Sequence, residues 1–386
     1  MKNISIIGAG ASGCFCAIEI KRRHPDACVT VYEAGPVPLA KVAVTGGGRC
    51  NFTNSFEGIR SLKEAYPRGE KLIKRALKVF SNTDCIEWFR REGVPSVLQD
   101  DCCVFPESQD ALQIVGTFES LMHRLGVRVQ TNSRIGSIDS LMADSDAVVV
   151  TTGGGVPSFL EGLSLDIVPP VPSLFTFRIN DRELTSLMGT VVENASLRIA
   201  GEPFRSGGAL LVTDWGFSGP ATLKLSSYAA RYLAEHQYKA ALSVNWTGAD
   251  EEELRAWIST VSSSNPGKQI SNTCYPSLSS RLWKFLMSRA GLREDIKWSE
   301  AGQKSLNKLV SVLTSDEYRI EGRCRFKEEF VTCGGVALSN VDSNTLECKK
   351  IPGLYFAGEV LDIDAITGGF NLQAAWSTAM MIARSL

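Results

Sequence analysis

The feature that most constrains this chain is a short apolar segment that runs straight into a glycine-rich turn. Residues 4–7 have the composition of a buried parallel strand, and Gly8, Gly10 and Gly13 follow in the spacing GxGxxG. Residues 14–23 then have a helical composition without a breaker. In this motif the first glycine permits a tight turn, the second lets backbone approach a pyrophosphate, and the third lets helix pack against strand. The segment predicts a dinucleotide site, and a purely structural turn is the alternative.

A carboxylate in the expected position supports the dinucleotide interpretation. Residues 29–32 read as a second strand, and Glu33 ends it about 20 residues after the third glycine. A carboxylate at that point accepts hydrogen bonds from ribose hydroxyls. The pyrophosphate would lie at the N-terminus of the first helix, where unpaired N–H groups favour negative charge.

Composition restricts the class of protein. The chain has 386 residues, which is enough for two or three domains, and its formal net charge is −1, so no overall field attracts nucleic acid or membrane. No apolar run reaches the roughly 18 residues of a membrane helix. Eleven cysteines without a CxxC spacing predict reduced thiols and a cytoplasmic location. The three histidines are far apart, so we expect no metal site.

A second glycine-rich segment follows the second strand. Three consecutive glycines at 46–48 lie between Lys41 and Arg49, and Cys50 and Asn51 come next. Backbone amides and cationic side chains beside an anionic cofactor explain this pattern. A plain surface loop is the alternative.

The middle of the chain predicts an inserted region. We expect helical structure from 55 to 126, including helices over 69–80, 84–92 (capped by Ser81 or Thr83) and 110–125, and then strands over 127–131, 135–138 and 147–151. Prolines at 169–172 mark a crossing between domains. Beyond it we expect strands of a small antiparallel sheet or barrel over 174–179, 191–200, 209–213 and 240–246, a helix over 221–234, and a helical region from 250 to 313.

The C-terminal segment has the same kind of pattern as the N-terminal one, with an apolar strand, a glycine-rich turn and a helix. An apolar strand ends in Gly358-Glu359, and Gly368-Gly369-Phe370-Asn371 opens a helix over 374–386. A glycine and a carboxylate at a strand end can bind the ribitol hydroxyls of a flavin, and a glycine turn that opens a helix can present N–H groups to its pyrimidine carbonyl. A simple NAD enzyme would not need this second site, so the pattern favours FAD.

These motifs together resemble the bacterial FAD-binding oxidoreductases called aminoacetone-oxidase-like or BaiN-like flavoproteins, within the glutathione-reductase-type class. The resemblance spans nearly the whole chain and rests on segments 8–13 with Glu33, 45–54, 152–154, 217–220, 332–336 and 353–373. Where the family tends to place Gly-Arg before Phe-Pro, this chain has Cys102-Cys103-Val104.

The resemblance implies an α/β fold with a Rossmann-like FAD-binding domain split between both chain ends (1–168 and 331–386). An antiparallel β-barrel (169–249 and 314–330) and a small helical subdomain (250–313) are inserted. It implies FAD contacts at Gly8, Gly10, Ala11, Ser12, Gly13, Glu33, Ala34, Lys41, Gly48, Arg49, Cys50, Asn51, Thr152, Gly153, Gly358, Glu359, Gly369, Phe370 and Asn371.

Three functions remain open. The first is an FAD-dependent oxidoreductase that transfers a hydride between the flavin and a small organic substrate or transiently bound NAD(P)H. A disulfide reductase is disfavoured because the chain has no CxxC and no second GxGxxG. No catalytic acid or base is assigned, since Asp362 and Asp364 could serve or could cap the glycine turn.

The second function is binding or modification of RNA. It rests on eight Lys or Arg against three acidic residues between 268 and 308, although a solvated helix face is the favoured explanation of this excess. The third is an FAD-bound scaffold without catalysis.

Overall fold

The computed structural model describes residues 2–324 and 331–386. Contacts divide the chain into two compact units, here called unit 1 (Met1–Val171 with Val331–Leu386) and unit 2 (Pro172–Phe330). The separate helical subdomain over 250–313 stays a prediction. In the part of the chain that is described, no helix combines the length and apolarity that crossing a membrane requires.

Unit 1 contains a five-stranded parallel sheet in the order β16-β7-β1-β2-β6. The strands are β1 (Asn3–Ile7), β2 (Cys28–Tyr32), β6 (Arg128–Gln130), β7 (Ala147–Val150) and β16 (Leu354–Phe356). Every residue of β7 and β16 is buried, which explains their continuous apolar composition. Because all five strands are parallel, the loops that follow them meet at one edge of the sheet.

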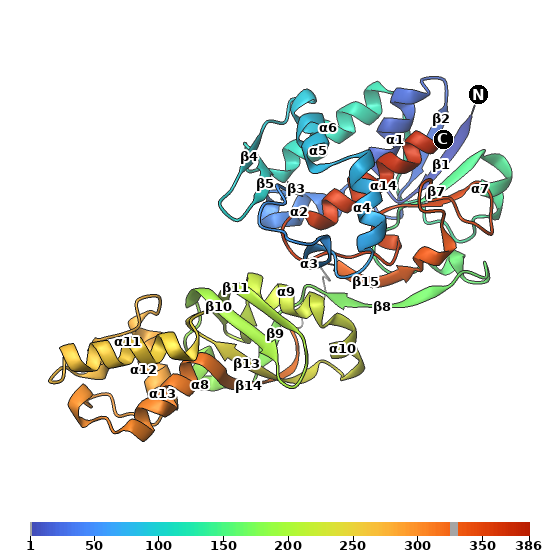
Figure 1. The fold of residues 1–386 in the computed structure, drawn as a ribbon. Helices are drawn as coiled ribbons and strands as arrows, with labels where there is room; N and C mark the ends of the chain where they lie inside the picture. The colour runs from blue at the N-terminus through green and yellow to red at the C-terminus, as the bar shows by residue number, and fades with distance from the viewer. Residues whose placement is uncertain (1, 325–330) are drawn as a thin grey trace. The chain divides into compact units, whose positions relative to one another are not determined.

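The two ends of the chain pack together in unit 1. Helix α1 (Ala11–Arg23) contacts helix α14 (Phe370–Ser385), and Figure 1 shows them side by side in blue and red. The Phe15 ring lies 5.6 Å from that of Trp376 and 5.0 Å from that of Trp88. This aromatic core also includes Phe118 of α6 (Ala111–Arg124) and Phe89 of α5 (Asn82–Arg91).

Ser81 caps α5 with a complete capping box, as one of the two expected caps. The other helices of unit 1 are α2 (Ala40–Gly48), α3 (Leu62–Ala65), α4 (Glu70–Val79) and α7 (Asp139–Asp144).

Two smaller sheets complete unit 1. One has the order β3-β5-β4 (Thr53–Asn54, Cys103–Pro106 and Ser96–Leu98), and the other pairs β15 (Val331–Val336) with β8 (Ile167–Ser173). The expectation of uniform helix from 55 to 126 is therefore wrong, because a β-hairpin interrupts it. The strand expected over 135–138 is also absent: these residues form a loop in which Ser137 accepts a hydrogen bond from the Asp139 amide, and α7 begins at Asp139.

Unit 2 contains a closed six-stranded barrel in the order β10-β11-β12-β9-β14-β13, with neighbouring strands antiparallel. The strands are β9 (Phe177–Ile179), β10 (Val191–Ile199), β11 (Arg205–Thr213), β12 (Gly216–Ser218), β13 (Lys239–Asn245) and β14 (Asp316–Arg323). Alternate residues of β10, such as Leu197 and Ile199, are buried in the barrel core. The predicted barrel is confirmed.

Six helices of unit 2 accompany the barrel in the described residues: α8 (Arg182–Thr185), α9 (Pro220–Tyr228), α10 (Ala230–Glu235), α11 (Glu251–Ser264), α12 (Ser280–Arg289) and α13 (Gln303–Ser315). The helix expected over 221–234 is broken at Ala229, which lies between α9 and α10 with non-helical backbone.

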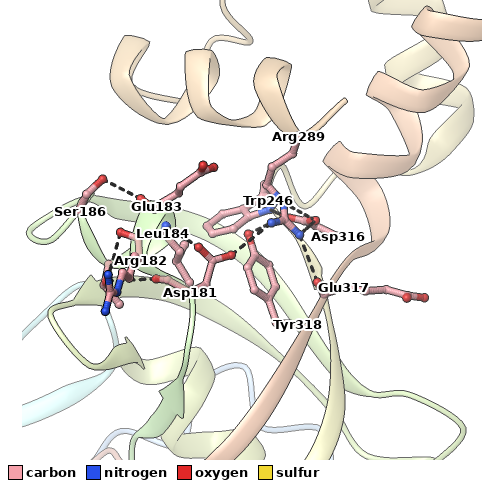
Figure 2. A network of polar contacts seen from close by, with 11 residues as sticks. Asp181, Arg182, Glu183, Leu184, Ser186, Trp246, Arg289, Asp316, Glu317 and Tyr318 are labelled. Carbon is pink, nitrogen blue, oxygen red and sulfur yellow. Dashed lines mark hydrogen bonds and ion pairs between the residues drawn. The ribbon is translucent and has the colours of Figure 1, made fainter. Parts of the chain in front are cut away.

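A polar network joins α12 to the barrel (Figure 2). Asp316 accepts hydrogen bonds from the Trp246 indole at 3.1 Å, the Tyr318 hydroxyl at 2.5 Å and the Arg289 guanidinium at 2.8 Å. Arg289 also bonds Asp181, the N-cap residue of α8, at 3.2 Å. The buried Asp316 carboxylate thus has a hydrogen-bond donor at each of its two oxygens.

The predicted α/β fold with its inserted barrel is confirmed.

Candidate functional site

The three glycines after β1 have different surroundings. Gly8 has φ +105°, and a Cβ there would lie 2.5 Å from the Thr151 carbonyl oxygen. A Cβ at Gly13 would overlap the carbonyl oxygen of Gly8, whereas one at Gly10 would meet nothing within 4 Å. The first and third glycines therefore permit the turn and the helix packing, and the second leaves its backbone open for close approach by a ligand.

Thr151 holds this turn and was missed by the sequence analysis. Its Oγ1 lies 2.9 Å from the Gly8 carbonyl oxygen and 3.1 Å from that of Ile7. Thr151 directly follows β7, the neighbour of β1 in the sheet. The sequence shows a hydroxyl residue directly after a buried strand. This identifies Thr151 as a partner of the glycine turn only when the pairing of β7 with β1 is known.

Glu33 lies beside the glycine turn, as its position after β2 predicts. Its Oε2 accepts a hydrogen bond from the Ala9 amide at 2.9 Å, and its Oε1 accepts one from the Gly35 amide at 2.7 Å. Ala34 lies between these contacts in the same loop. The carboxylate is therefore fixed at the carboxyl edge of the sheet.

The start of α1 contains an unsatisfied polar atom. The Ser12 hydroxyl is buried and has no hydrogen-bond partner among the described residues. Gly358, which follows β16 with φ +75°, packs against it, since a Cβ at Gly358 would lie 3.0 Å from Ser12 Cβ. Ala11 is the first residue of the helix. A buried hydroxyl beside open amides at a helix N-terminus suits an anionic ligand.

A pair of opposite charges lies where β7 and β16 end. The Lys41 ammonium is 3.8 Å from Glu359 Oε2, and Glu359 Oε1 accepts a hydrogen bond from the Thr332 amide at 2.8 Å. Thr152 and Gly153 follow β7, and a Cβ at Gly153 would lie 3.7 Å from Glu359 Oε2. The structure thus brings the expected residues of three distant segments together.

The glycine-rich segment at 46–48 ends α2 with three consecutive residues at positive φ. A Cβ at Gly48 would meet nothing within 4 Å. The Arg49 guanidinium lies 4.4 Å from the centre of the Phe105 ring. Cys50 is buried, and burial raises the pKa of its thiol to about 11. Arg49 therefore contacts β5 in this structure, and cofactor contacts of Arg49 and Cys50 stay predictions.

Segment 51–54 joins the C-terminal glycine turn. Asn54 Nδ2 donates to the Gly368 carbonyl at 2.9 Å, and Thr53 Oγ1 donates to Gln373 Oε1 at 2.5 Å. With its amide oriented to donate to the Thr53 carbonyl at 2.8 Å, Asn51 accepts a hydrogen bond from the Gly369 amide at 3.2 Å. Segments 45–54 and 353–373, two of those on which the family resemblance rests, therefore form one substructure.

The side chains of Phe370 and Asn371 stabilise this turn. The Phe370 ring packs edge-on against Tyr66 at 5.9 Å, and the Tyr66 hydroxyl donates to the Phe370 carbonyl at 2.8 Å. Asn371 Oδ1 accepts a hydrogen bond from the Ala365 amide at 2.9 Å. A cofactor contact of Phe370 or Asn371 would have to use atoms other than those in these hydrogen bonds and this ring contact.

The two candidate acid–base residues, Asp362 and Asp364, have different surroundings. Asp364 is fully buried and forms an ion pair with Arg68, whose Nε lies 2.5 Å from Asp364 Oδ1. The Asp362 amide donates to the Val336 carbonyl at 2.9 Å. Asp364 is thus held in a charge pair that fixes the loop before the glycine turn, which argues against a role in proton transfer.

Taken together, these residues fit a dinucleotide cofactor. Gly10 has an open backbone, Ser12 has an unpartnered hydroxyl, and Glu33 provides a carboxylate one strand away. Gly369 opens a second helix, α14, which packs against α1. These features define a Rossmann-type dinucleotide-binding protein.

The family can now be stated. Residues 2–385 match the family described as HI0933-like protein Rossmann domain, and the chain belongs to that family. It is an FAD-dependent oxidoreductase of the BaiN-like type, so the resemblance seen in the sequence is confirmed.

Three curated relatives cover nearly the whole chain. Ribosomal RNA dihydrouridine synthase of Haemophilus influenzae is 28% identical, over 99% of this chain and 97% of the relative. Ribosomal RNA dihydrouridine synthase of Escherichia coli K12 is 29% identical, over 99% and 97%. The 3-dehydro-bile acid delta(4,6)-reductase of Clostridium scindens is 25% identical, over 100% and 99%.

Proposed function

We propose that this protein is an FAD-dependent reductase that adds a hydride to a carbon–carbon double bond conjugated to a carbonyl group. The names of the three relatives support this reaction class. Dihydrouridine is uridine whose C5=C6 bond, conjugated to C4=O, has been reduced. A delta(4,6)-reductase acting on a 3-dehydro bile acid reduces double bonds conjugated to the 3-oxo group. The two substrates differ, but the reacting unit is the same.

The observation that carries the FAD site of this proposal is the pair of glycine turns that open α1 and α14, two helices that pack against each other. Gly10 and Ser12 at the start of α1 would hold the pyrophosphate, and Glu33 would accept hydrogen bonds from the ribose. Glu359 would hold the ribitol hydroxyls, and the Gly369 end of α14 would direct its positive dipole end at the flavin. Bound FAD supplies the hydride transfer, and the chain positions it.

NAD(P)H is the proposed electron donor and the conjugated carbonyl compound the small-molecule acceptor. We also propose a cytoplasmic location, because the cysteines of the described residues are reduced thiols.

The test is anaerobic stopped-flow spectroscopy of the FAD-loaded protein. We expect NADH or NADPH to bleach the flavin absorbance and 2-cyclohexenone or a 4-en-3-one steroid to restore it. The saturated ketones are the matched controls and should leave the flavin reduced. Restoration by oxygen alone would indicate an oxidase and reject the proposal. A flavin that no donor reduces would favour the non-catalytic scaffold.

Reduction of uracil in RNA is the second candidate. It is supported by the names of the two ribosomal RNA relatives and by exposed basic residues of unit 2, including Lys268, Arg281, Lys304 and Lys308. Other basic residues there are paired, as Lys284 is with Glu294 and Arg293 with Asp295. A gel shift with ribosomal RNA that weakens steeply with salt, together with newly formed dihydrouridine, would support it. Absence of binding at low salt would reject it.

A further inference from the structure

Two adjacent cysteines occupy the turn of the β4–β5 hairpin. The Cys102 amide donates to the Gln99 carbonyl at 2.9 Å, and the Gln99 amide donates to the Cys103 carbonyl at 2.9 Å. Cys102 has φ +66°, a left-handed conformation that favours glycine. Of the eleven cysteines, these are the only neighbours in sequence. Cys102 thus has a strained backbone conformation and is next in sequence to a second cysteine, Cys103.

The two thiols differ in accessibility. Cys102 is half-buried, whereas Cys103 is 7% exposed. Burial raises the pKa of Cys103 to about 12, helped by the nearby charge of Asp101, and Cys102 also interacts electrostatically with it. Cys102 is therefore the thiol that meets a reagent from solvent, and Cys103, its neighbour in sequence, is shielded from that reagent.

The pair is connected to the C-terminal glycine turn through one strand. Cys103 is the register partner of Asn54 in β3, and Asn54 Nδ2 donates to the Gly368 carbonyl at 2.9 Å. The Cys102 carbonyl accepts a hydrogen bond from the Ser55 amide at 2.9 Å. A change at the peptide between Cys102 and Cys103 therefore acts directly on the strand that holds this turn.

We propose that Cys102 and Cys103 are a redox modification site, a vicinal dithiol that a small-molecule disulfide converts into an intramolecular disulfide. The Cys102 thiolate attacks the reagent RSSR, forms Cys102–SR and releases one thiol RSH. Cys103 then gives up its thiol proton as its Sγ attacks Cys102 Sγ, which closes the ring and releases the second RSH. The two cysteines lose two electrons and two protons, and RSSR gains both.

The physical properties of such a bond suit a reversible modification. Adjacent Cα atoms are about 3.8 Å apart across a trans peptide. Most disulfides join Cα atoms roughly 4.4–6.8 Å apart, and departures from that range store strain and make the bond easier to reduce. Closing the ring also perturbs the Cys102 carbonyl that holds Ser55. We expect oxidation to loosen the contact between Asn54 and Gly368, and an effect on FAD affinity rests on the proposed function.

The experiment treats the reduced full-length protein with oxidised glutathione, followed by peptide mapping by mass spectrometry. The peptide containing both cysteines should lose two hydrogens and carry no glutathione. Cys103→Ala should trap glutathione on Cys102, and Cys102→Gly, which relieves the left-handed strain, should leave Cys103 unmodified. The half-buried Cys274, with no adjacent thiol, should gain glutathione without ring closure.

A wild-type protein that retains glutathione on Cys102, as the Cys103→Ala variant does, would overturn the proposal. So would a failure of Cys102 to react when Cys274 does. Hydrogen exchange supplies a second measurement, in which amides of residues 53–56 and 366–369 should exchange faster after oxidation, and only when both cysteines are present. Both measurements use the protein without added FAD, so their outcome is separate from that of the proposed enzymatic reaction.

Discussion

The guanidinium of Arg289 donates two hydrogen bonds to one carboxylate oxygen of Asp316, from Nε at 2.9 Å and Nη2 at 2.8 Å (Figure 2). Arg289 is the last residue of α12 and Asp316 the first of β14. The Asp316 side chain is only 4% exposed, so its charge depends on these donors. The contact fixes a helix to the barrel through a buried charge.

Replacing Arg289 should therefore destabilise unit 2. Arg289→Met leaves Asp316 buried with the Trp246 and Tyr318 donors alone, and we expect a loss of about 2–3 kcal/mol, at or below the usual cost of breaking a buried pair. Hydrogen exchange of the α12 amides under increasing urea measures it. Arg293→Met, at an exposed pair with Asp295, is the control and should cost less than about 1 kcal/mol. Equal effects of the two changes would refute a special role for the Arg289 contact.

Substitutions in the glycine turn after β1 should affect folding and cofactor binding separately. Gly10 has φ −83°, and a Cβ there meets no protein atom within 4 Å, so Gly10→Ala should fold as stably as the native chain. It should lose FAD affinity at least tenfold, because the methyl group occupies the space in which a pyrophosphate approaches. Fluorescence titration with FAD and thermal unfolding without FAD measure the two properties.

Gly13→Ala is the matched comparison. Its Cβ would overlap the Gly8 carbonyl oxygen, so we expect loss of soluble, folded protein whether or not FAD is added. Normal FAD binding by Gly10→Ala would show that the pyrophosphate does not approach this backbone.

Glu33→Ala should weaken FAD binding by roughly 1.5–3 kcal/mol, the contribution of a hydrogen bond to a charged partner. The carboxylate also accepts from the amides of Ala9 and Gly35, so the unliganded protein should lose some stability as well. Isothermal titration with FAD and unfolding without it distinguish the two effects. Glu33→Gln keeps one acceptor oxygen and should fall between the native protein and Glu33→Ala. Unchanged FAD affinity in both variants would mean that Glu33 only stabilises the loop.

The cap of α5 should contribute to acid sensitivity. The Asp84 carboxylate accepts hydrogen bonds from the Ser81 amide at 2.9 Å and from the Ser81 hydroxyl at 2.7 Å. The hydrogen bond from the amide is the main cause of the lowered pKa of Asp84. A carboxylate whose pKa is lower in the folded state stabilises the protein above its unfolded pKa, and this contribution is lost as pH falls through the folded value. Because Asp84 is exposed, we expect less than about 1 kcal/mol.

The measurement compares native protein with Asp84→Asn. Urea unfolding from about pH 5 down to about pH 2 covers the range in which the Asp84 contribution disappears. The difference in unfolding free energy between the two proteins should be largest at the upper end and shrink toward the lower end. A difference that does not change with pH would mean that charge on Asp84 does not stabilise the cap.

Local patterns made much of the site predictable. The turn after β1 and the position of Glu33 follow from spacing along a short segment, because a strand, a tight turn and a helix impose their residue requirements locally. Contacts between distant segments were not predictable. The partners Arg68 and Asp364 are separated by 296 residues, and nothing in either neighbourhood identifies the other.

The β4–β5 hairpin was missed for a different reason. Its turn places Cys102 at positive φ, where sequence rules expect glycine or asparagine. The barrel strands over 191–200 and 240–246 were predicted from their local sequence, but their pairing, such as Leu197 with Val244, depends on contacts between segments that local sequence does not encode.

The discontinuous make-up of unit 1 has a consequence for biosynthesis. Residues 172–330 emerge from the ribosome as one uninterrupted stretch and carry the whole barrel, so unit 2 has its complete sequence before unit 1 does. Strand β16 and helix α14 are synthesised after unit 2, and until they are released Ser12 lacks its neighbour Gly358 and Asn54 lacks Gly368. The proposed cofactor cradle can therefore be completed only after the whole of unit 2 has been synthesised, and we expect flavin to bind after that point.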